Sequence, residues 1–217
     1  MIFADRSQAG KLLAGHLLDY QDRSPVVLGL PRGGVEVAAE VALALGAPLD
    51  VIVARKLGFP GNPELAIGAV TARGTRVLND ALLRQVLLPP GFLGQETESQ
   101  RRVAEEREQR LRAARPAISL EGRNVILVDD GIATGMTALA AIHDLWERHP
   151  RAVVLATPVG PRRTLERLQP EVDAVVSLET PDDFLAIGQF YEDFSQVLDE
   201  RVTELLAANR LAVGPGI

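Results

Sequence analysis

The sequence predicts an α/β protein built on an open, mostly parallel sheet with helices on both faces. Short apolar runs that are typical of buried strands alternate along the chain with longer segments of helical periodicity. Strands that are separated by helices pair in parallel, because a parallel crossover needs a long connection. The length of 217 residues corresponds to one domain, which can bury a substantial core.

The segments expected before residue 120 follow from these hydrophobic patterns. In order, they are a helix at 7–20, a strand at 26–30, a helix at 35–46, a strand at 49–55, two strands between 67 and 80, and a helix at 96–115. The loop at 56–65 has Gly or Pro at four of its ten positions, so we expect a mobile lid there. Eleven charged residues in the helix at 96–115 predict an exposed helix. Its i,i+4 ion pairs are expected to be Glu98–Arg102, Glu106–Arg110 and Glu108–Arg112.

The second half of the chain repeats the alternation of strand and helix. It contains a strand–loop–helix unit at 124–146, a strand at 152–160, a short helix at 161–168 and a strand at 173–178. The tail from Glu179 holds four of the nine aromatic residues. In sheets of this class ligands bind beyond the carboxyl ends of the strands, so motifs at those ends are the candidates for function.

The composition excludes several other classes of protein. There is no Cys and the three His are scattered, so disulfides and zinc sites are not expected. The net charge of −6 argues against a dedicated nucleic-acid binder, which usually carries a basic excess. The first residues lack an apolar run of signal-peptide length, and no stretch approaches the roughly 18 apolar residues of a membrane span. We therefore expect a cytoplasmic protein that binds neither membranes nor nucleic acids.

The segment VILVDDGIATGMT, at 125–137, carries the most specific chemistry. A buried strand delivers Asp129 and Asp130 to a loop with two Gly and two Thr, which enters a helix. Free N–H groups at such a place can hold a phosphate dianion. The adjacent carboxylates repel a phosphate and suit hydroxyl groups, a metal or a developing cation, so a phosphorylated sugar would fit both halves. The alternative is a glycine-rich turn capped by Thr134 or Thr137, which leaves the two acids unexplained.

This segment resembles, position for position, the motif with which type I phosphoribosyltransferases bind phosphoribosyl pyrophosphate (PRPP). The similarity is greatest to bacterial members with a DDGIATG-type loop, and it extends over about residues 25–195. The resemblance implies a five-stranded parallel sheet flanked by helices, with a small hood over the acceptor base. It also implies that 1–217 form a single domain in which 179–217 contribute the hood and a C-terminal helix.

The resemblance assigns roles to the residues of the motif. Asp129 and Asp130 would contact the ribose 2′- and 3′-hydroxyls and act in catalysis. The residues expected to hold the 5′-phosphate are Gly131, Ile132, Ala133, Thr134, Gly135, Met136 and Thr137. Mg²⁺ would be bound mainly through PRPP, with the two acids as its candidate protein ligands.

Two further strand ends resemble parts of the same site. The segment GLPRGG looks like the family's pyrophosphate loop, in which Arg32 could bind phosphate oxygens and Gly33 and Gly34 allow close approach of the backbone. Arg55 and Lys56 are similar to the start of the mobile catalytic loop of adenine and orotate phosphoribosyltransferases. The resemblance implies that both bind pyrophosphate and that Lys56 also acts in catalysis. Lys56 is one of only two lysines beside 21 arginines, which indicates that an ammonium group is wanted there. The alternative is an ordinary solvated lysine.

The aromatic tail resembles the hood of hypoxanthine-guanine phosphoribosyltransferases. Phe184 and Tyr191 would be the aromatic candidates to cover the base, and Asp193 the acid near the metal. The alternative is that these aromatics close a small core.

The implied reaction is displacement of pyrophosphate from C1 of PRPP by a nitrogenous base, in a Mg²⁺-dependent enzyme that we expect to be a homodimer. Two alternatives stay open: a regulator that senses PRPP or nucleotides without transferase activity, and a relative of PRPP synthetases. The acceptor is not identified, and a purine is one candidate. Ala133 stands where the hypoxanthine-guanine branch has an Asp, and the strand at 152–157 ends in Ala156-Thr157-Pro158, where that branch has a base-reading Lys. A 6-oxopurine handled in that manner is therefore not expected, whereas the loop and Arg55-Lys56 are similar to the adenine branch.

Overall fold

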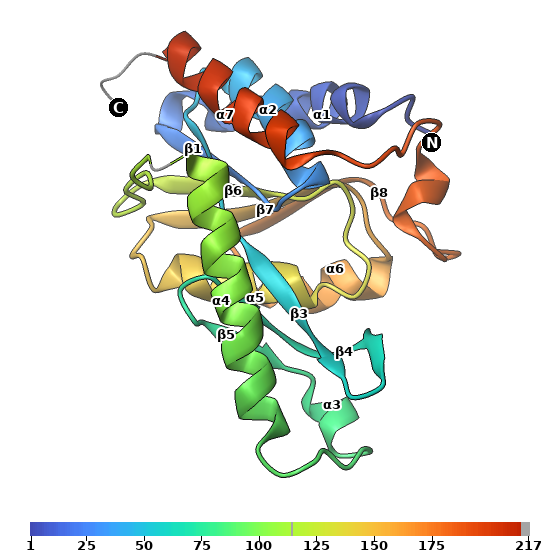
Figure 1. Ribbon diagram of the computed structural model, residues 1–217. Coiled ribbons are helices and arrows are strands. Elements are labelled where there is room, and N and C mark those ends of the chain that lie inside the picture. Colours follow the sequence, from blue (N-terminus) through green and yellow to red (C-terminus); the bar gives the residue numbers. More distant parts are fainter. Residues whose placement is uncertain (114, 214–217) are drawn as a thin grey trace.

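The computed structural model describes residues 1–113 and 115–213, and its centre is a five-stranded sheet in which all strands are parallel (Figure 1). The strand order is β2-β1-β6-β7-β8. The bounds are Pro25–Gly29 for β1, Leu49–Val51 for β2, Asn124–Val128 for β6, Ala152–Val159 for β7 and Ala174–Glu179 for β8. This confirms the predicted fold class. Residue 114 of the predicted helix and residues 214–217 of the predicted single domain lie outside the described residues.

Helices cover both faces of the parallel sheet (Figure 1). On one side lie α1 (Arg6–Gly15), α2 (Gly33–Leu45) and α7 (Asp199–Val213), and on the other α5 (Met136–Trp146) and α6 (Arg162–Leu168). Strand residues alternate between the two cores, since Val27 packs with α1, α2 and α7, whereas Val26 and Leu28 pack with α5 and α6. Short 3₁₀ turns follow α1, α6 and β8 at Leu18–Arg23, Gln169–Glu171 and Ile187–Phe190.

A second, antiparallel sheet projects from the parallel core (Figure 1). It consists of β3 (Ala54–Phe59), β4 (Asn62–Thr71) and β5 (Arg76–Leu78), followed by α3 (Asp80–Leu83) and α4 (Phe92–Arg112). The loop predicted at 56–65 is therefore wrong as secondary structure, because it forms a hairpin that turns at Pro60 and Gly61. Leu57, Ile67 and Val70 bury completely between this sheet and the helices beside it, which explains why the segment pairs. Whether the hairpin moves as a lid stays a prediction.

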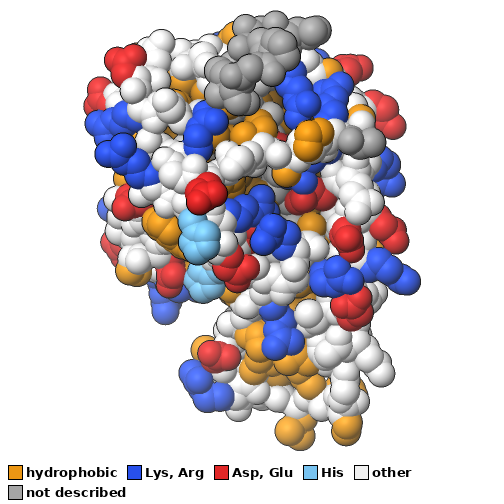
Figure 2. All heavy atoms as spheres, turned by 90° about the vertical axis from the view of Figure 1, so that its left-hand side faces the viewer, with side chains coloured by type: hydrophobic (Ala, Val, Ile, Leu, Met, Phe, Trp, Pro, Cys, Tyr) orange, Lys and Arg blue, Asp and Glu red, His pale blue; other side chains and the backbone are white. Residues whose placement is uncertain are grey.

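Hydrophobic side chains gather at the outer end of this projection (Figure 2). Leu65 and Leu87 are exposed there, while Leu82, Leu83 and Phe92 pack in part against the buried residues of the small sheet.

The long helix α4 is exposed on only part of its surface, since Ala104, Glu108 and Leu111 are buried. The predicted pair of Glu108 and Arg112 is confirmed, with 2.5 Å between Oε1 and Nη1. Of the other predicted pairs none forms among the described residues. Arg101 instead binds Glu98 and Glu105, and Arg110 binds Asp199 of α7.

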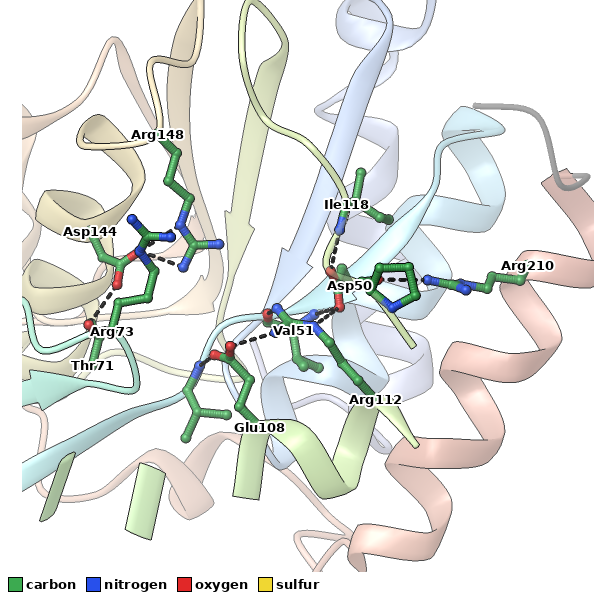
Figure 3. A network of polar contacts seen from close by, with 12 residues as sticks. Asp50, Val51, Thr71, Arg73, Glu108, Arg112, Ile118, Asp144, Arg148 and Arg210 are labelled. Carbon is green, nitrogen blue, oxygen red and sulfur yellow. Dashed lines mark hydrogen bonds and ion pairs between the residues drawn. The ribbon is translucent and has the colours of Figure 1, made fainter. Parts of the chain in front are cut away.

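Two buried ionic clusters join the projecting part to the core, one through α4 and one through β4 (Figure 3). Asp50 of β2 accepts hydrogen bonds from Arg112 Nε at 2.8 Å and from the N–H of Ile118 at 3.0 Å, and Glu108 accepts from the N–H of Val53 at 3.1 Å.

The second cluster centres on Asp144 of α5, whose side chain is fully buried. It accepts from the Thr71 hydroxyl of β4 at 2.6 Å and from Arg148 Nε at 2.7 Å. This cluster joins β4, which pairs with β3 and so lies next to Lys56, to α5 of the parallel core.

Within the described ranges we found no helix that combines the length and the apolar character needed to cross a membrane.

Candidate active site

A pocket of about 150 Å³ opens at the carboxyl end of β6, where the sequence predicts the site. It is lined by Lys56, Asp129, Asp130, Gly131, Ile132, Ala133, Thr134, Gly135, Thr137, Ala138 and Ile187. The structure thus brings the acid pair, most of the predicted phosphate loop and Lys56 together, although Lys56 lies on the other sheet.

The phosphate loop is held from three sides. The N–H of Ile132 donates to the carbonyl of Val159 at 2.9 Å, and Gly135 turns into α5 with a φ of +73°, which favours glycine. From α6, the Thr164 hydroxyl donates to the carbonyl of Ala133 at 2.9 Å, and the Arg167 guanidinium donates to the carbonyl of Thr134. With these carbonyls bound on the outside, the N–H groups at the start of α5 are left for an anion.

The two acids have different surroundings. Asp129 Oδ1 accepts from the N–H of Asp130 at 2.9 Å. Burial raises the pKa of the Asp129 carboxyl well above its usual range, and the neighbouring Asp130 carboxylate raises it further. Asp130 Oδ2 accepts from Arg6 Nε at 2.6 Å, and the side chains of both partners are largely buried.

The Gly-Gly pair of the predicted pyrophosphate loop packs directly on these acids. A Cβ atom on Gly33 would overlap the Asp130 carboxylate, and one on Gly34 would lie 2.9 Å from Asp129 Cα. Both positions therefore require glycine for packing against the acids. The predicted approach of their backbone to a pyrophosphate stays a prediction. Arg32 is half-buried beside them, and the amide of Gln196 lies against its guanidinium.

Arg55 and Lys56 separate because successive residues of a strand face opposite ways. Lys56 lines the pocket, whereas Arg55 Nε donates to Gln100 Oε1 of α4 at 2.7 Å. The structure brings Lys56 to the site and turns Arg55 towards α4, so the pyrophosphate role of Arg55 stays a prediction.

The predicted hood residues lie beside the pocket but do not line it. Tyr191 is buried against Phe3 and Phe194, with centroid distances of 5.4 and 5.1 Å, and its hydroxyl donates to the carbonyl of Asp130 at 2.6 Å. Burial raises the pKa of this hydroxyl, as does the Asp130 charge. Phe184 stacks on Phe190, which matches the alternative of a small aromatic core. Asp193 accepts from the N–H of Ser195 at 2.8 Å, and hydrogen bonding to Ser195 lowers the pKa of its carboxyl.

Sequence reasoning missed several residues of the site. Ile187 lines the pocket and packs so closely on Gly131 that a Cβ there would collide with it. Arg6, Thr164 and Arg167 each hold a loop or acid of the site from a distant segment. No local pattern marks them, because only the fold brings them near.

The residues present fit a Mg²⁺ ion that is bound chiefly by its substrate. The described residues contain no group of three or more side chains suited to a metal, and the pocket offers only the two adjacent carboxylates. Mg²⁺ commonly keeps several waters and takes one or two carboxylates together with substrate phosphates, which agrees with this small donor set.

Comparison with known proteins gives consistent matches. A family model described as the phosphoribosyl transferase domain matches residues 6–195. Over 205 residues the chain is 46% identical to a protein of Mycobacterium tuberculosis H37Rv whose name assigns it provisionally to the phosphoribosyl transferases; the alignment covers 94% of this chain and 46% of that protein. The chain therefore spans about half the length of the curated relatives it matches first.

Two further matches cover more of their partners. A uracil phosphoribosyltransferase of Bifidobacterium longum is 30% identical over 152 residues, which are 67% of each protein. The crystal structure of TT1426 from Thermus thermophilus is 47% identical and has a TM-score of 0.81, covering 96% of this chain and 99% of that one.

Proposed function

Because this chain belongs to the phosphoribosyl transferase family, we propose that it is an enzyme that displaces pyrophosphate from PRPP with a nitrogenous acceptor. The observation that carries the proposal is the pocket in which Asp129, Asp130, Lys56 and the phosphate loop meet. A phosphorylated sugar with a pyrophosphate at C1 has groups that complement each of these parts.

Each part of the pocket has a task in such a reaction. The N–H groups of the loop bind the 5′-phosphate at the start of α5. The acceptor nitrogen forms a bond to C1 while the bond from C1 to pyrophosphate breaks. The electron pair of that bond leaves with pyrophosphate, and the proton of the acceptor N–H passes to pyrophosphate or water. Asp129 and Asp130 bind ribose hydroxyls and stabilise the positive charge that develops on the sugar. Lys56 stabilises the negative charge on the leaving group, and Mg²⁺, when bound, would neutralise pyrophosphate further.

We favour an acceptor base that is not a 6-oxopurine. A 6-oxopurine handled as in the hypoxanthine-guanine branch would need a carboxylate in the phosphate loop as its proton acceptor. Ala133 lines the pocket and has no proton acceptor in its side chain, and Thr157 is buried in β7, where its hydroxyl donates to the carbonyl of Val159. Steady-state assays with adenine, hypoxanthine, guanine and xanthine test this choice. Efficient turnover of hypoxanthine or guanine that Ala133→Asp does not improve would contradict it.

A regulator that binds PRPP without turning it over is the second candidate. The position of the predicted hood favours it. Among the residues that the structure describes, Phe184 and Tyr191 do not line the pocket, so neither covers the place where an acceptor base would bind. Exchange of labelled pyrophosphate into PRPP, with each candidate base present, separates the two: exchange identifies the transferase, and binding without exchange identifies the regulator. The proposal includes a cytoplasmic homodimer, which cell fractionation and light scattering would test.

A further inference from the structure

Arg6 is a buried arginine that belongs to none of the predicted motifs. It begins α1 and is only 8% exposed, yet it reaches an acid that lies 124 positions later in the sequence. Its Nε donates to Asp130 Oδ2 at 2.6 Å, and its Nη1 donates to the carbonyl of Ser195 at 2.9 Å. The guanidinium therefore has one contact with the site and a second with the segment that leads to α7.

Aromatic rings fix the guanidinium in this position. Its central carbon lies 4.0 Å from the ring centre of Phe194 and 5.9 Å from that of Tyr191, which are distances of cation–π contacts. The hydroxyl of Tyr191 holds the main-chain carbonyl of Asp130 at 2.6 Å. Asp130 is thus bound at its side chain by Arg6 and at its backbone by a neighbour of Arg6.

The consequence for Asp130 is that its two carboxylate oxygens differ. Among the hydrogen bonds of the described residues, those to its side chain use Oδ2 only, which leaves Oδ1 for a ligand in the pocket that Asp130 lines. A charge-assisted bond of 2.6 Å also removes the rotational freedom that an unpaired carboxylate would have. Arg6 itself does not line the pocket, so it can influence a ligand there through Asp130.

We propose that Arg6 is a positioning residue, which holds Asp130 with one oxygen bound and the other directed to the ribose of PRPP. This inference rests on the proposed function. Burying an ion pair is costly unless good geometry and further hydrogen bonds compensate. The pair of Arg6 and Asp130 has such compensation, because Arg6 also donates to the carbonyl of Ser195. Since the acid of this pair lines the pocket, the pair can act on a ligand as well as on stability.

The test is a double-mutant cycle on PRPP affinity, measured by titration calorimetry with Mg²⁺ present. Arg6→Gln should weaken PRPP binding about tenfold, as expected when a charge-assisted contact that orients a ligand group is lost. Asp130→Asn should weaken it at least as much. The double variant should bind no more weakly than Asp130→Asn alone, because Arg6 acts through Asp130.

Arg107→Gln is the matched control, since Arg107 forms a 2.7 Å ion pair with Asp199 between α4 and α7, away from the pocket. It should lower the melting temperature and leave PRPP affinity unchanged, which separates loss of stability from loss of positioning. Should Arg6→Gln fail to fold, Arg6→Lys serves in its place. Lysine keeps the charge but has a single nitrogen, so it should still weaken binding about threefold, and this loss should again vanish in the Asp130→Asn background.

Two results would overturn the inference in distinguishable ways. If the wild-type protein binds PRPP and the losses from Arg6 and Asp130 add independently, the positioning role is wrong and the proposed function stands. If the wild-type protein does not bind PRPP, the proposed function fails and the inference fails with it.

Discussion

Asp129 and Asp130 are neighbours in the chain, but their carboxyl groups have different charged groups around them. Asp130 lies against the guanidinium of Arg6, whereas Asp129 is half-buried, lines the pocket and lies beside another carboxylate. Burial and the charge of Asp130 raise the pKa of Asp129, so the site holds an acid whose ionised form is unfavourable in the folded protein. Such a group serves a ligand that brings positive charge or hydroxyl donors.

We predict that Asp129→Asn makes the protein more stable and less active. Below about pH 4 the carboxyl is protonated in both the folded and the unfolded chain. Above that pH the unfolded chain releases the proton while the folded chain keeps it, so the wild-type protein loses stability until the raised folded pKa is passed. The amide of Asp129→Asn does not ionise in either state, so the variant does not lose stability in this way. Its free energy of unfolding should therefore exceed that of the wild type at pH 7.

Urea unfolding from pH 4 to pH 8 in Mg²⁺-free buffer measures this difference, which should shrink towards pH 4. Turnover of PRPP should fall about 100-fold, since an electrostatic contact with the transition state is lost. A variant that is less stable than the wild type at pH 7, or one with full turnover, would show that the carboxylate has a structural task.

Lys56 allows an internal comparison because the chain has only one other lysine. Lys56→Ala should lower turnover about 100-fold and change PRPP affinity much less, because its charge is needed most as pyrophosphate leaves. Lys11→Ala, at an exposed position of α1, removes the same charge outside the pocket and should leave both quantities unchanged. If both variants lower turnover equally, Lys56 affects the reaction only through the net charge of the protein and does not act on the leaving group in the pocket.

At the scale of elements, the parallel core could be predicted from the sequence and the projecting sheet could not be predicted fully. β1, β6 and β7 are runs in which nearly every residue is apolar and buried, so their pattern is unambiguous. The hairpin of β3 and β4 contains Gly58, Pro60, Gly61 and Pro63, residues that indicate a loop when read locally. Its pairing depends on burial against α4 and its neighbours, which no local pattern shows.

Some residues of the candidate site could likewise be predicted from the sequence, and others could not. The phosphate loop and acid pair are contiguous in sequence, and Lys56 could be predicted because lysine is rare in this chain. Arg6, Thr164 and Ile187 could not, because each is an ordinary residue type whose position matters only once distant elements have packed.

The support of the phosphate loop by α6 leads to a prediction for that helix. Thr164→Val removes the hydroxyl that holds the carbonyl of Ala133 but keeps the shape of the side chain. PRPP affinity should fall about fivefold, the equivalent of one net hydrogen bond. Thr203→Val is the control, because the Thr203 hydroxyl makes a similar bond to the Asp199 carbonyl on α7. The interpretation fails if both variants weaken PRPP binding equally.

At the scale of the whole molecule, the small sheet is joined to α5 of the parallel core by an apolar cluster and by buried polar contacts. Asp144 is fully buried and binds Thr71 of the small sheet and Arg148 of the turn that follows α5 (Figure 3). Asp144→Ala should lower the free energy of unfolding by about 3 kcal/mol, since it leaves buried partners without their acceptor.

Chemical denaturation measures that loss, with Glu98→Ala as the control. Glu98 forms an exposed pair with Arg101, whose removal should cost less than about 1 kcal/mol. If Asp144→Ala also lowers the free energy of unfolding by less than about 1 kcal/mol, the contacts of Asp144 contribute little to stability.

Residues near the N-terminus bind the segment that precedes α7, beside the site. The N–H of Phe3 donates to the carbonyl of Phe190 at 2.8 Å, the N–H of Glu192 donates to the carbonyl of Phe3 at 2.8 Å, and Arg6 binds Ser195 close by. During synthesis at roughly 5–20 residues per second, these partners leave the ribosome roughly 10 to 40 seconds apart. A nascent chain that already contains the phosphate loop and both acids therefore still lacks the segment that closes over Arg6. A chain whose translation stops before residue 190 would lack the Ser195 carbonyl and the Phe194 ring that contact Arg6.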